Sequence, residues 1–212
     1  MRTLLLDLDG TLTDPFEGVS RALDHAMSGL GLAPLTEAQH RSCIGPPLPD
    51  SFSALGVPAG RVDEAITRYR EYFADQGLLE NRMYDGIPEA LAELRSRGIR
   101  LAVATSKPEP FAVQVIEHFG LDVHLDHVSG STLDGRVGTK AAVISLALDR
   151  LGEPDPRDVT MVGDRRHDVH GAAEHGIRCL GVRWGYAEPG ELEGAGAYAV
   201  AEQPGDLVTL LG

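Results

Sequence analysis

The chain has 212 residues, of which 42% are hydrophobic and 24% are charged, a composition typical of soluble globular proteins. Its formal net charge of −13 disfavours a nucleic acid polymer as partner, because a protein that binds phosphate backbones needs a basic face. No apolar run approaches the roughly 20 residues that span a bilayer, and the N-terminal run is too short for a signal peptide. We therefore expect a cytoplasmic protein with no membrane partner, either a monomer or a homodimer.

Short, continuous apolar runs predict strands that are buried on both faces of a sheet. In chain order these runs are Thr3–Asp7, Ile99–Ser106, Val159–Asp164 and Arg178–Val182, with weaker candidates at His127–Ser131 and Ala197–Ala201. Capped helical patterns lie between them, at Asp85–Gly98, Lys107–Gly120 and Thr139–Gly152. Strands alternating with helices of this length predict an α/β fold with a Rossmann-like, mostly parallel sheet.

The segment between the first two strands is too long for a simple crossover connection. About 90 residues separate the strands, whereas a crossover needs a dozen or so plus loops. The interval has helical patterns of its own, including one with capping-box spacing at Thr36 and Gln39. We therefore predict a small all-helical domain, residues 14–81, inserted into a core domain made of residues 1–13 and 82–212.

Polar side chains stand at the ends of three of the predicted strands. Asp7 and Asp9 end the first strand, Thr105 and Ser106 the second, and Asp164 the third. Ligand sites in open parallel sheets form beyond the carboxyl ends of the strands. We therefore expect these side chains to share one pocket.

The residue types in this pocket indicate phosphate chemistry. Asp7 and Asp164 would repel each other unless a cation lay between them, and oxygen ligands without Cys or His favour Mg²⁺. Thr105 offers a hydroxyl group, the loop amides after it can hold an anionic oxygen, and Lys140 adds a positive charge at a helix start. This combination predicts a site for phosphoryl transfer.

Four motifs occur in order along the chain: DLDGTLTD, ATSKP, TKAA and GDRRHD. Together they resemble the motifs of the haloacid-dehalogenase-like phosphohydrolases, and the helical insertion is similar to the cap domain of that family. The resemblance covers the whole chain.

The resemblance implies a role for each motif residue. Asp7 would be the nucleophile that forms an aspartyl-phosphate, and Asp9 would protonate the leaving oxygen and then activate water. Thr105 and the amide of Ser106 would bind the transferring phosphoryl group. Lys140 would orient Asp7, offset its charge and contribute to substrate binding.

The resemblance also implies the metal ligands. The carboxylates of Asp7 and Asp164 and the backbone carbonyl of Asp9 would hold Mg²⁺, and Asp168 would support this arrangement from behind the ligands.

In the predicted cap, the segment Cys43–Phe52 contains a stiff turn at Gly45, Pro46 and Pro47. A turn of this sort shapes substrate choice in helical-cap relatives, and Arg41 is the nearest cation. Arg41 and Gly45 are therefore candidate substrate-binding residues.

Several activities of the family can be compared with these motifs. Asp9 argues against a dehalogenase, which lacks the second acid, and residues 14–81 contain no lysine for the Schiff base of a phosphonatase. A sugar-phosphate mutase shares the motifs and remains open, as does a binding module that has lost catalysis. The motifs look most like those of the phosphoglycolate-phosphatase group, especially its 5′-nucleotidase-like branch. We expect a Mg²⁺-dependent phosphatase for a small-molecule phosphate ester, with nucleoside 5′-monophosphates ahead of phosphoglycolate.

Overall fold

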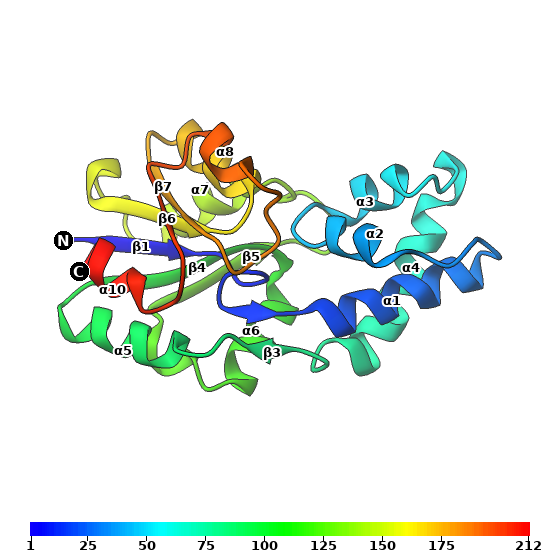
Figure 1. Cartoon of the computed structure of the whole chain (residues 1–212), viewed down its shortest axis with the longest axis horizontal. Coiled ribbons are helices and arrows are strands. Elements are labelled where there is room, and N and C mark those ends of the chain that lie inside the picture. Colours follow the sequence, from blue (N-terminus) through cyan, green and yellow to red (C-terminus); the bar gives the residue numbers. More distant parts are fainter. The chain divides into compact units, whose positions relative to one another are not determined.

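The computed structural model describes all 212 residues, and its internal contacts divide the chain into two compact units. The core unit consists of Met1–Asp14 and Met83–Gly212, and the helical unit consists of Pro15–Arg82. Figure 1 labels the elements of both units along the chain.

A six-stranded sheet forms the centre of the core unit, in the order β5–β4–β1–β6–β7–β8. Every neighbouring pair is parallel, so the predicted parallel α/β sheet is confirmed. The strands are β1 (Thr3–Leu6), β4 (Arg100–Pro108), β5 (His127–Ser131), β6 (Val159–Gly163), β7 (Arg178–Val182) and β8 (Ala199–Ala201). All six strands lie where the apolar runs of the sequence predict them.

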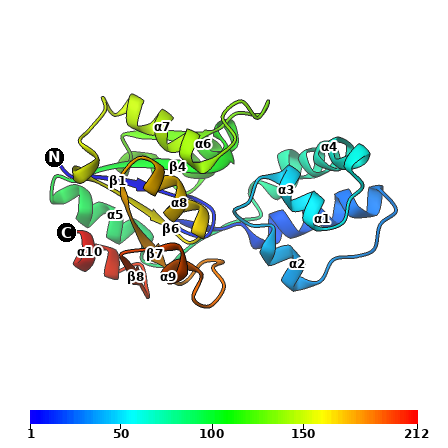
Figure 2. The same ribbon diagram turned by 90° about the horizontal axis from the view of Figure 1, so that it is seen from above.

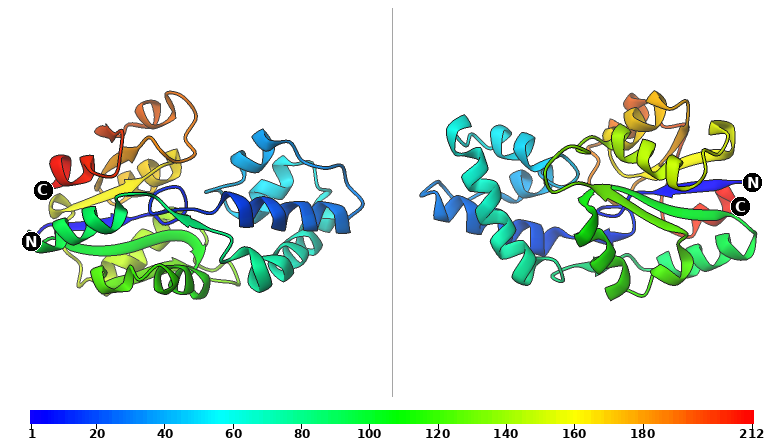
Figure 3. Two further views of the ribbon diagram at one scale, coloured as in Figure 1. Left: turned by 60° about the horizontal axis from the view of Figure 1, so that its bottom comes forward. Right: turned by 180° about the vertical axis from the view of Figure 1, so that it is seen from behind.

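The strand order changes direction beside β1. The chain builds β4 and β5 on one side of β1 and then returns to build β6, β7 and β8 on the other side. Figure 3 shows β1 between β4 and β6. In open α/β sheets the crevice for a ligand lies at such a reversal, outside the carboxyl ends of the strands. The acidic segment that follows β1 therefore starts at the position where this fold binds its ligands.

Helices cover both faces of the sheet in the core unit (Figures 1 and 2). Leu5 of β1 is buried against one face together with Val143 and Val169, while Leu4 and Leu6 alternate to the other face. The first face is covered by α7 (Lys140–Arg150), α8 (Arg166–Glu174) and α9 (Glu191–Ala195), and the second by α5 (Ile87–Ser96), α6 (Glu109–His118) and α10 (Asp206–Leu211). Short 3₁₀ turns lie at Asp122–His124 and Pro156–Asp158.

The helical unit packs α1 along α4. The predicted capping box at Thr36 and Gln39 is present at the start of α2. The helices are α1 (Phe16–Gly29), α2 (Glu37–Ser42), α3 (Leu48–Ala54) and α4 (Val62–Tyr72), with a 3₁₀ turn at Ala59–Arg61 and a π-helical turn at Phe73–Gly77. The short strands β2 (Thr13–Asp14) and β3 (Arg82–Met83) pair where the chain leaves and re-enters the core unit. No helix of either unit is both long and apolar enough to cross a membrane.

Helix α3 is an element that the sequence patterns did not predict, because its prolines suggested only a turn. Pro49 lies in the first turn of this helix, where a missing backbone N–H breaks no intrahelical hydrogen bond. The turn itself occupies residues 43–47, and Gly45 in it has a φ of +104°.

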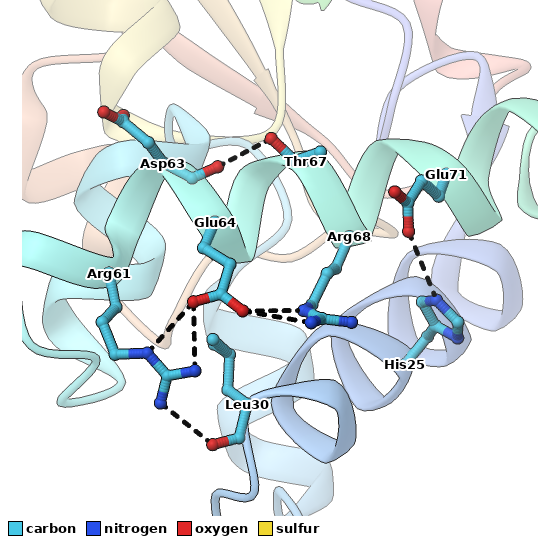
Figure 4. A network of polar contacts seen from close by, with 8 residues as sticks. All are labelled: His25, Leu30, Arg61, Asp63, Glu64, Thr67, Arg68 and Glu71. Atoms are coloured by element: carbon cyan, nitrogen blue, oxygen red, sulfur yellow. Dashed lines mark hydrogen bonds and ion pairs between the residues drawn. The ribbon is translucent and has the colours of Figure 1, made fainter.

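Exposed ion pairs connect neighbouring turns of the helical unit (Figure 4). Glu64 of α4 receives hydrogen bonds of 3.1 Å from both Arg61 and Arg68, and Arg61 also donates to the carbonyl of Leu30. Exposed pairs of this kind contribute about 0.2–1 kcal/mol each. The apolar faces buried between the helices therefore contribute most of the stability of this unit.

The central strand provides a test of the core. Leu5→Ala should lower the free energy of unfolding by about 2–5 kcal/mol, because Leu5 is fully buried and its truncation leaves a cavity. Leu210→Ala is the matched control; Leu210 is 44% exposed, so its truncation should change stability by less than about 0.5 kcal/mol. Urea unfolding followed by circular dichroism measures both changes, and equal losses would contradict the position of Leu5 in the core.

Candidate active site

Three buried carboxylates meet at the carboxyl ends of β1 and β6. One oxygen atom from each of Asp7, Asp164 and Asp168 lies within 4.8 Å of the other two. Asp7 directly follows β1 and Asp164 directly follows β6, and the amide of Asp7 donates to the carbonyl of Val162 at 2.9 Å. The parallel pairing of the two strands therefore brings these two acids together, and the first turn of α8 adds Asp168.

Lys140, the first residue of α7, lies between two of these acids. Its Nζ atom is 2.8 Å from Oδ1 of Asp7 and 2.8 Å from Oδ1 of Asp168, and it donates to the carbonyl of Ala104 at 3.2 Å. The hydroxyl of Thr139 accepts a hydrogen bond from the amide of Ala142, which fixes where the helix begins. The cap thereby fixes the backbone position of Lys140, from which its ammonium group reaches the acids.

The local charges shift the pKa values of the cluster. Burial raises the pKa of Asp164 well above its ordinary value, and the charges of Asp168 and Asp7 raise it further. Burial also raises the pKa of Asp168, to about 6, against the opposing charge of Lys140. For Lys140, burial lowers the pKa, but the charges of Asp168 and Asp7 outweigh burial and raise it above its ordinary range. The site therefore has more negative charge than Lys140 can balance.

Asp9 pairs with a second lysine, Lys107, that the sequence analysis missed. The Nζ atom of Lys107 lies 2.6 Å from Oδ2 of Asp9, and its side chain is only 4% exposed. Burial raises the pKa of Asp9, while the charge of Lys107 lowers it. The sequence pattern placed Lys107 at the start of a helix, but β4 continues to Pro108 and α6 begins only at Glu109. The spacing from Thr105 could have identified Lys107, because residues two apart on an extended strand point to the same side.

Thr105 and Ser106 lie near the end of β4. Thr105 is 1% exposed, and its Oγ1 atom accepts a hydrogen bond of 3.2 Å from the amide of Lys107. The carbonyl of Ser106 accepts a hydrogen bond of 2.8 Å from the hydroxyl of Ser131 on β5. These bonds fix the backbone around the residues that are expected to bind the phosphoryl group.

A loop after β7 holds Asp164 in place at the end of β6. The amide of Tyr186 donates to Oδ2 of Asp164 at 2.8 Å, and the Tyr186 hydroxyl donates to the carboxylate of Asp14. The indole Nε1 of Trp184 donates to the carbonyl of Thr11 at 3.0 Å. These hydrogen bonds give both aromatic residues a role in supporting the site.

Two glycines allow the backbone to close around Asp164. A Cβ atom on Gly10 would lie 2.1 Å from Oδ2 of Asp164, and Gly10 also has a φ of +86°. A Cβ atom on Gly185 would lie 2.4 Å from the same oxygen. Side chains at either position would displace the carboxylate, so both glycines are part of the site.

Two predicted site residues belong to the helical unit. Arg41 lies in α2, and Gly45 lies in the turn that follows it. Their roles in substrate binding stay predictions.

The family model of the haloacid dehalogenase-like hydrolases matches residues 4–182. The chain therefore belongs to this family, as its four motifs predict.

Individual relatives are also similar to this chain. It is 43% identical over 184 residues to a tyrosine-protein kinase, PtkA, from Mycobacterium tuberculosis; the match covers 86% of this chain but 62% of the relative, so the chain spans about three fifths of that relative's length. It is 44% identical over 190 residues to a 5′-nucleotidase from Pseudomonas aeruginosa, covering 89% of this chain and 86% of that protein. A predicted phosphatase from Clostridium acetobutylicum has a crystal structure that matches with a TM-score of 0.94 at 36% identity, covering 99% of this chain and 97% of that one.

The charge balance of the site fits a divalent cation. The four acids Asp7, Asp9, Asp164 and Asp168 face two ammonium groups, which leaves two negative charges when all are ionised. Oδ1 of Asp164 is buried and accepts no hydrogen bond. A buried carboxylate oxygen without a partner is costly unless it binds a cation.

Metal binding can be tested through stability. Mg²⁺ should raise the midpoint of thermal unfolding, because a ligand that binds only the folded state stabilises it, by about 2.7 kcal/mol at 100 times its Kd. Asp164→Asn should remove most of this shift, and Asp149→Asn, at an exposed position of α7, should retain it. Differential scanning fluorimetry with MgCl₂ or EDTA measures both; an equal shift in the two variants would contradict a metal site at Asp164.

Proposed function

We propose that the protein is a Mg²⁺-dependent phosphomonoesterase that acts on a small phosphate ester through an aspartyl-phosphate on Asp7. The observation that carries the proposal is the pairing of each acid of the DLDG motif with its own buried lysine. Asp7 lies 2.8 Å from Lys140, and Asp9 lies 2.6 Å from Lys107. Two neighbouring carboxylates in different electrostatic surroundings support different chemical roles.

In this mechanism Asp7 is the nucleophile. Both the amide of Leu8 and the ammonium of Lys140 donate to its Oδ1 atom at 2.8 Å, so its carboxylate is held in one orientation. Asp168 accepts from the amide of Arg165 and contacts Lys140, and thereby fixes the lysine.

The carboxylates of Asp7 and Asp164 and the backbone carbonyl of Asp9 would hold Mg²⁺. When bound, the ion supplies positive charge that allows an anionic phosphoryl group to approach Asp7.

Asp9 moves the protons of the reaction. It donates a proton to the leaving oxygen as the bond from phosphorus to Asp7 forms, and it then accepts one from the water that hydrolyses the aspartyl-phosphate. The hydroxyl of Thr105 and the amide of Ser106 bind the phosphoryl oxygens in both steps. The raised pKa of Asp9 supports this role, because burial favours its protonated form.

We favour nucleoside 5′-monophosphates over phosphoglycolate as substrates. The support is the 44% identity to a protein named 5′-nucleotidase. In the helical unit, Arg41 and Gly45 are the residues expected to meet the leaving group.

A cytoplasmic location and a monomeric or homodimeric state remain expectations from the sequence.

Hydrolysis of p-nitrophenyl phosphate tests the proposal. The protein should release phosphate with MgCl₂ and not with EDTA, and Asp7→Asn should lower kcat by at least about 1,000-fold while the fold is retained, since the nucleophile is lost. Asp149→Asn should keep the wild-type rate. Substantial turnover by Asp7→Asn would refute the assignment of the nucleophile.

A substrate panel separates the remaining alternatives. Rates of phosphate release from nucleoside 5′-monophosphates and phosphoglycolate, compared as kcat/KM, test the preferred substrate. Isomer exchange of sugar phosphates without phosphate release would instead identify a mutase. The tyrosine-kinase relative makes phosphoryl transfer to a phenolic hydroxyl a further outcome to measure in the panel.

A further inference from the structure

The chain contains only two lysines, Lys107 and Lys140, and every other residue among its 19 Lys and Arg side chains is an arginine. Both lysines are buried in the active site, and each pairs with one acid of the DLDG motif. Arginine carries the same charge on a planar fork, whereas lysine offers a compact ammonium group with three donors. This usage suggests that the compact ammonium matters at both positions. Lys107 lies within the ATSKP motif, but the resemblance implies a role only for Lys140.

The backbone of β4 is shaped to deliver Lys107. The pairing of β4 with β5 shifts register between Thr105 and Pro108, which marks a β-bulge. Gly130 of β5 passes so close that a Cβ atom on it would lie 2.6 Å from the carbonyl oxygen of Lys107. Within this irregular stretch the amide of Lys107 donates to Thr105 and its ammonium donates to Asp9.

The two oxygens of Asp9 have different surroundings. Oδ2 accepts a hydrogen bond of 2.6 Å from Lys107, and Oδ1 is buried without any hydrogen-bond partner. An ammonium group can only donate, so the oxygen beside Lys107 must be an acceptor. A proton on Asp9 therefore resides on Oδ1.

We propose that Lys107 is a positioning residue that holds Asp9 by Oδ2 so that Oδ1 delivers the proton to the leaving oxygen. The proposal rests on the proposed phosphatase function. In the step concerned, the bond from phosphorus to the ester oxygen breaks, a bond from phosphorus to Asp7 forms, and the proton of Asp9 passes to the ester oxygen, which leaves as a hydroxyl group. Lys107 itself forms and breaks no bond in this step.

The leaving group distinguishes this role from a direct role of Lys107 in phosphoryl binding. Phenyl phosphate and p-nitrophenyl phosphate are similar in size, but p-nitrophenolate is a much weaker base and leaves without a proton. If Lys107 acts through the proton donor Asp9, its loss lowers kcat/KM mainly for phenyl phosphate. If Lys107 binds the phosphoryl group, its loss lowers kcat/KM equally for both esters and also weakens inhibition by inorganic phosphate.

The experiment compares kcat/KM for the two esters in wild-type protein and in Lys107→Met. We expect kcat/KM to fall at least about 100-fold for phenyl phosphate, the scale of general acid catalysis, and less than about 10-fold for p-nitrophenyl phosphate. The inhibition constant of inorganic phosphate should stay unchanged. In an Asp9→Asn background, Lys107→Met should leave the ratio of the two rates unaltered, because the residue through which it acts is gone.

The ratio is measured on one preparation, so it does not depend on the fraction of folded protein, and Lys107→Gln serves if Lys107→Met does not fold. Arg150→Met is the control: it removes an ion pair of 2.8 Å to Glu109, beside the bulge, and should leave the ratio unchanged. An equal loss for both esters, or weaker inhibition by phosphate, would overturn the proposal. Absence of hydrolysis by the wild-type protein would instead refute the phosphatase function itself.

Discussion

The structure of the core unit depends on one electrostatic constraint: three buried carboxylates and the partly buried Asp9 are close together, with only two ammonium groups to balance them. Buried charges are tolerated only when they are paired and hydrogen-bonded. Lys140 bridges Asp7 and Asp168, and Lys107 pairs with Asp9, which leaves Asp164 with a buried oxygen and a raised pKa. The remaining negative charge is the physical basis for the proposed divalent cation, which would offset the repulsion between the acids.

The fold meets this constraint with ordinary features of a parallel sheet. β1 is paired on both sides, so its carboxyl end, and with it Asp7, has a fixed position between the ends of β4 and β6. Gly10 and Gly185 allow backbone to approach Asp164 where any side chain would collide with it. Lys107 lies where the pairing of β4 with β5 shifts register, and its ammonium donates to Asp9. Together these features determine where the side chains of the site lie.

Most of the sheet could be predicted because buried parallel strands are short continuous apolar runs. Four of the six stand out in the sequence, and the two at His127–Ser131 and Ala197–Ala201 give weaker patterns. The ends of elements were harder to predict. Pro108 and Pro110 suggested a helix from Lys107, yet β4 runs through Pro108, because Pro108 still pairs with Ser131 of β5 beyond the shift in register. Helix α3 was missed for a related reason, since a proline is compatible both with a turn and with the first turn of a helix.

The sequence by itself determined the family, the parallel α/β core and the set of acids and lysine that the motifs bring together, because motif spacing and apolar runs are local properties of the chain. Only the tertiary structure decided which groups pair. It assigned Lys140 to Asp7 and Asp168, Lys107 to Asp9, and the amide of Tyr186 to Asp164. These partners are 22 to 133 residues apart in the chain. The close approach of backbone to Asp164 also depends on Gly10 and Gly185. Sequence periodicity indicates which way a side chain such as Lys107 points, but not its partner, which depends on how the strands and loops pack in three dimensions.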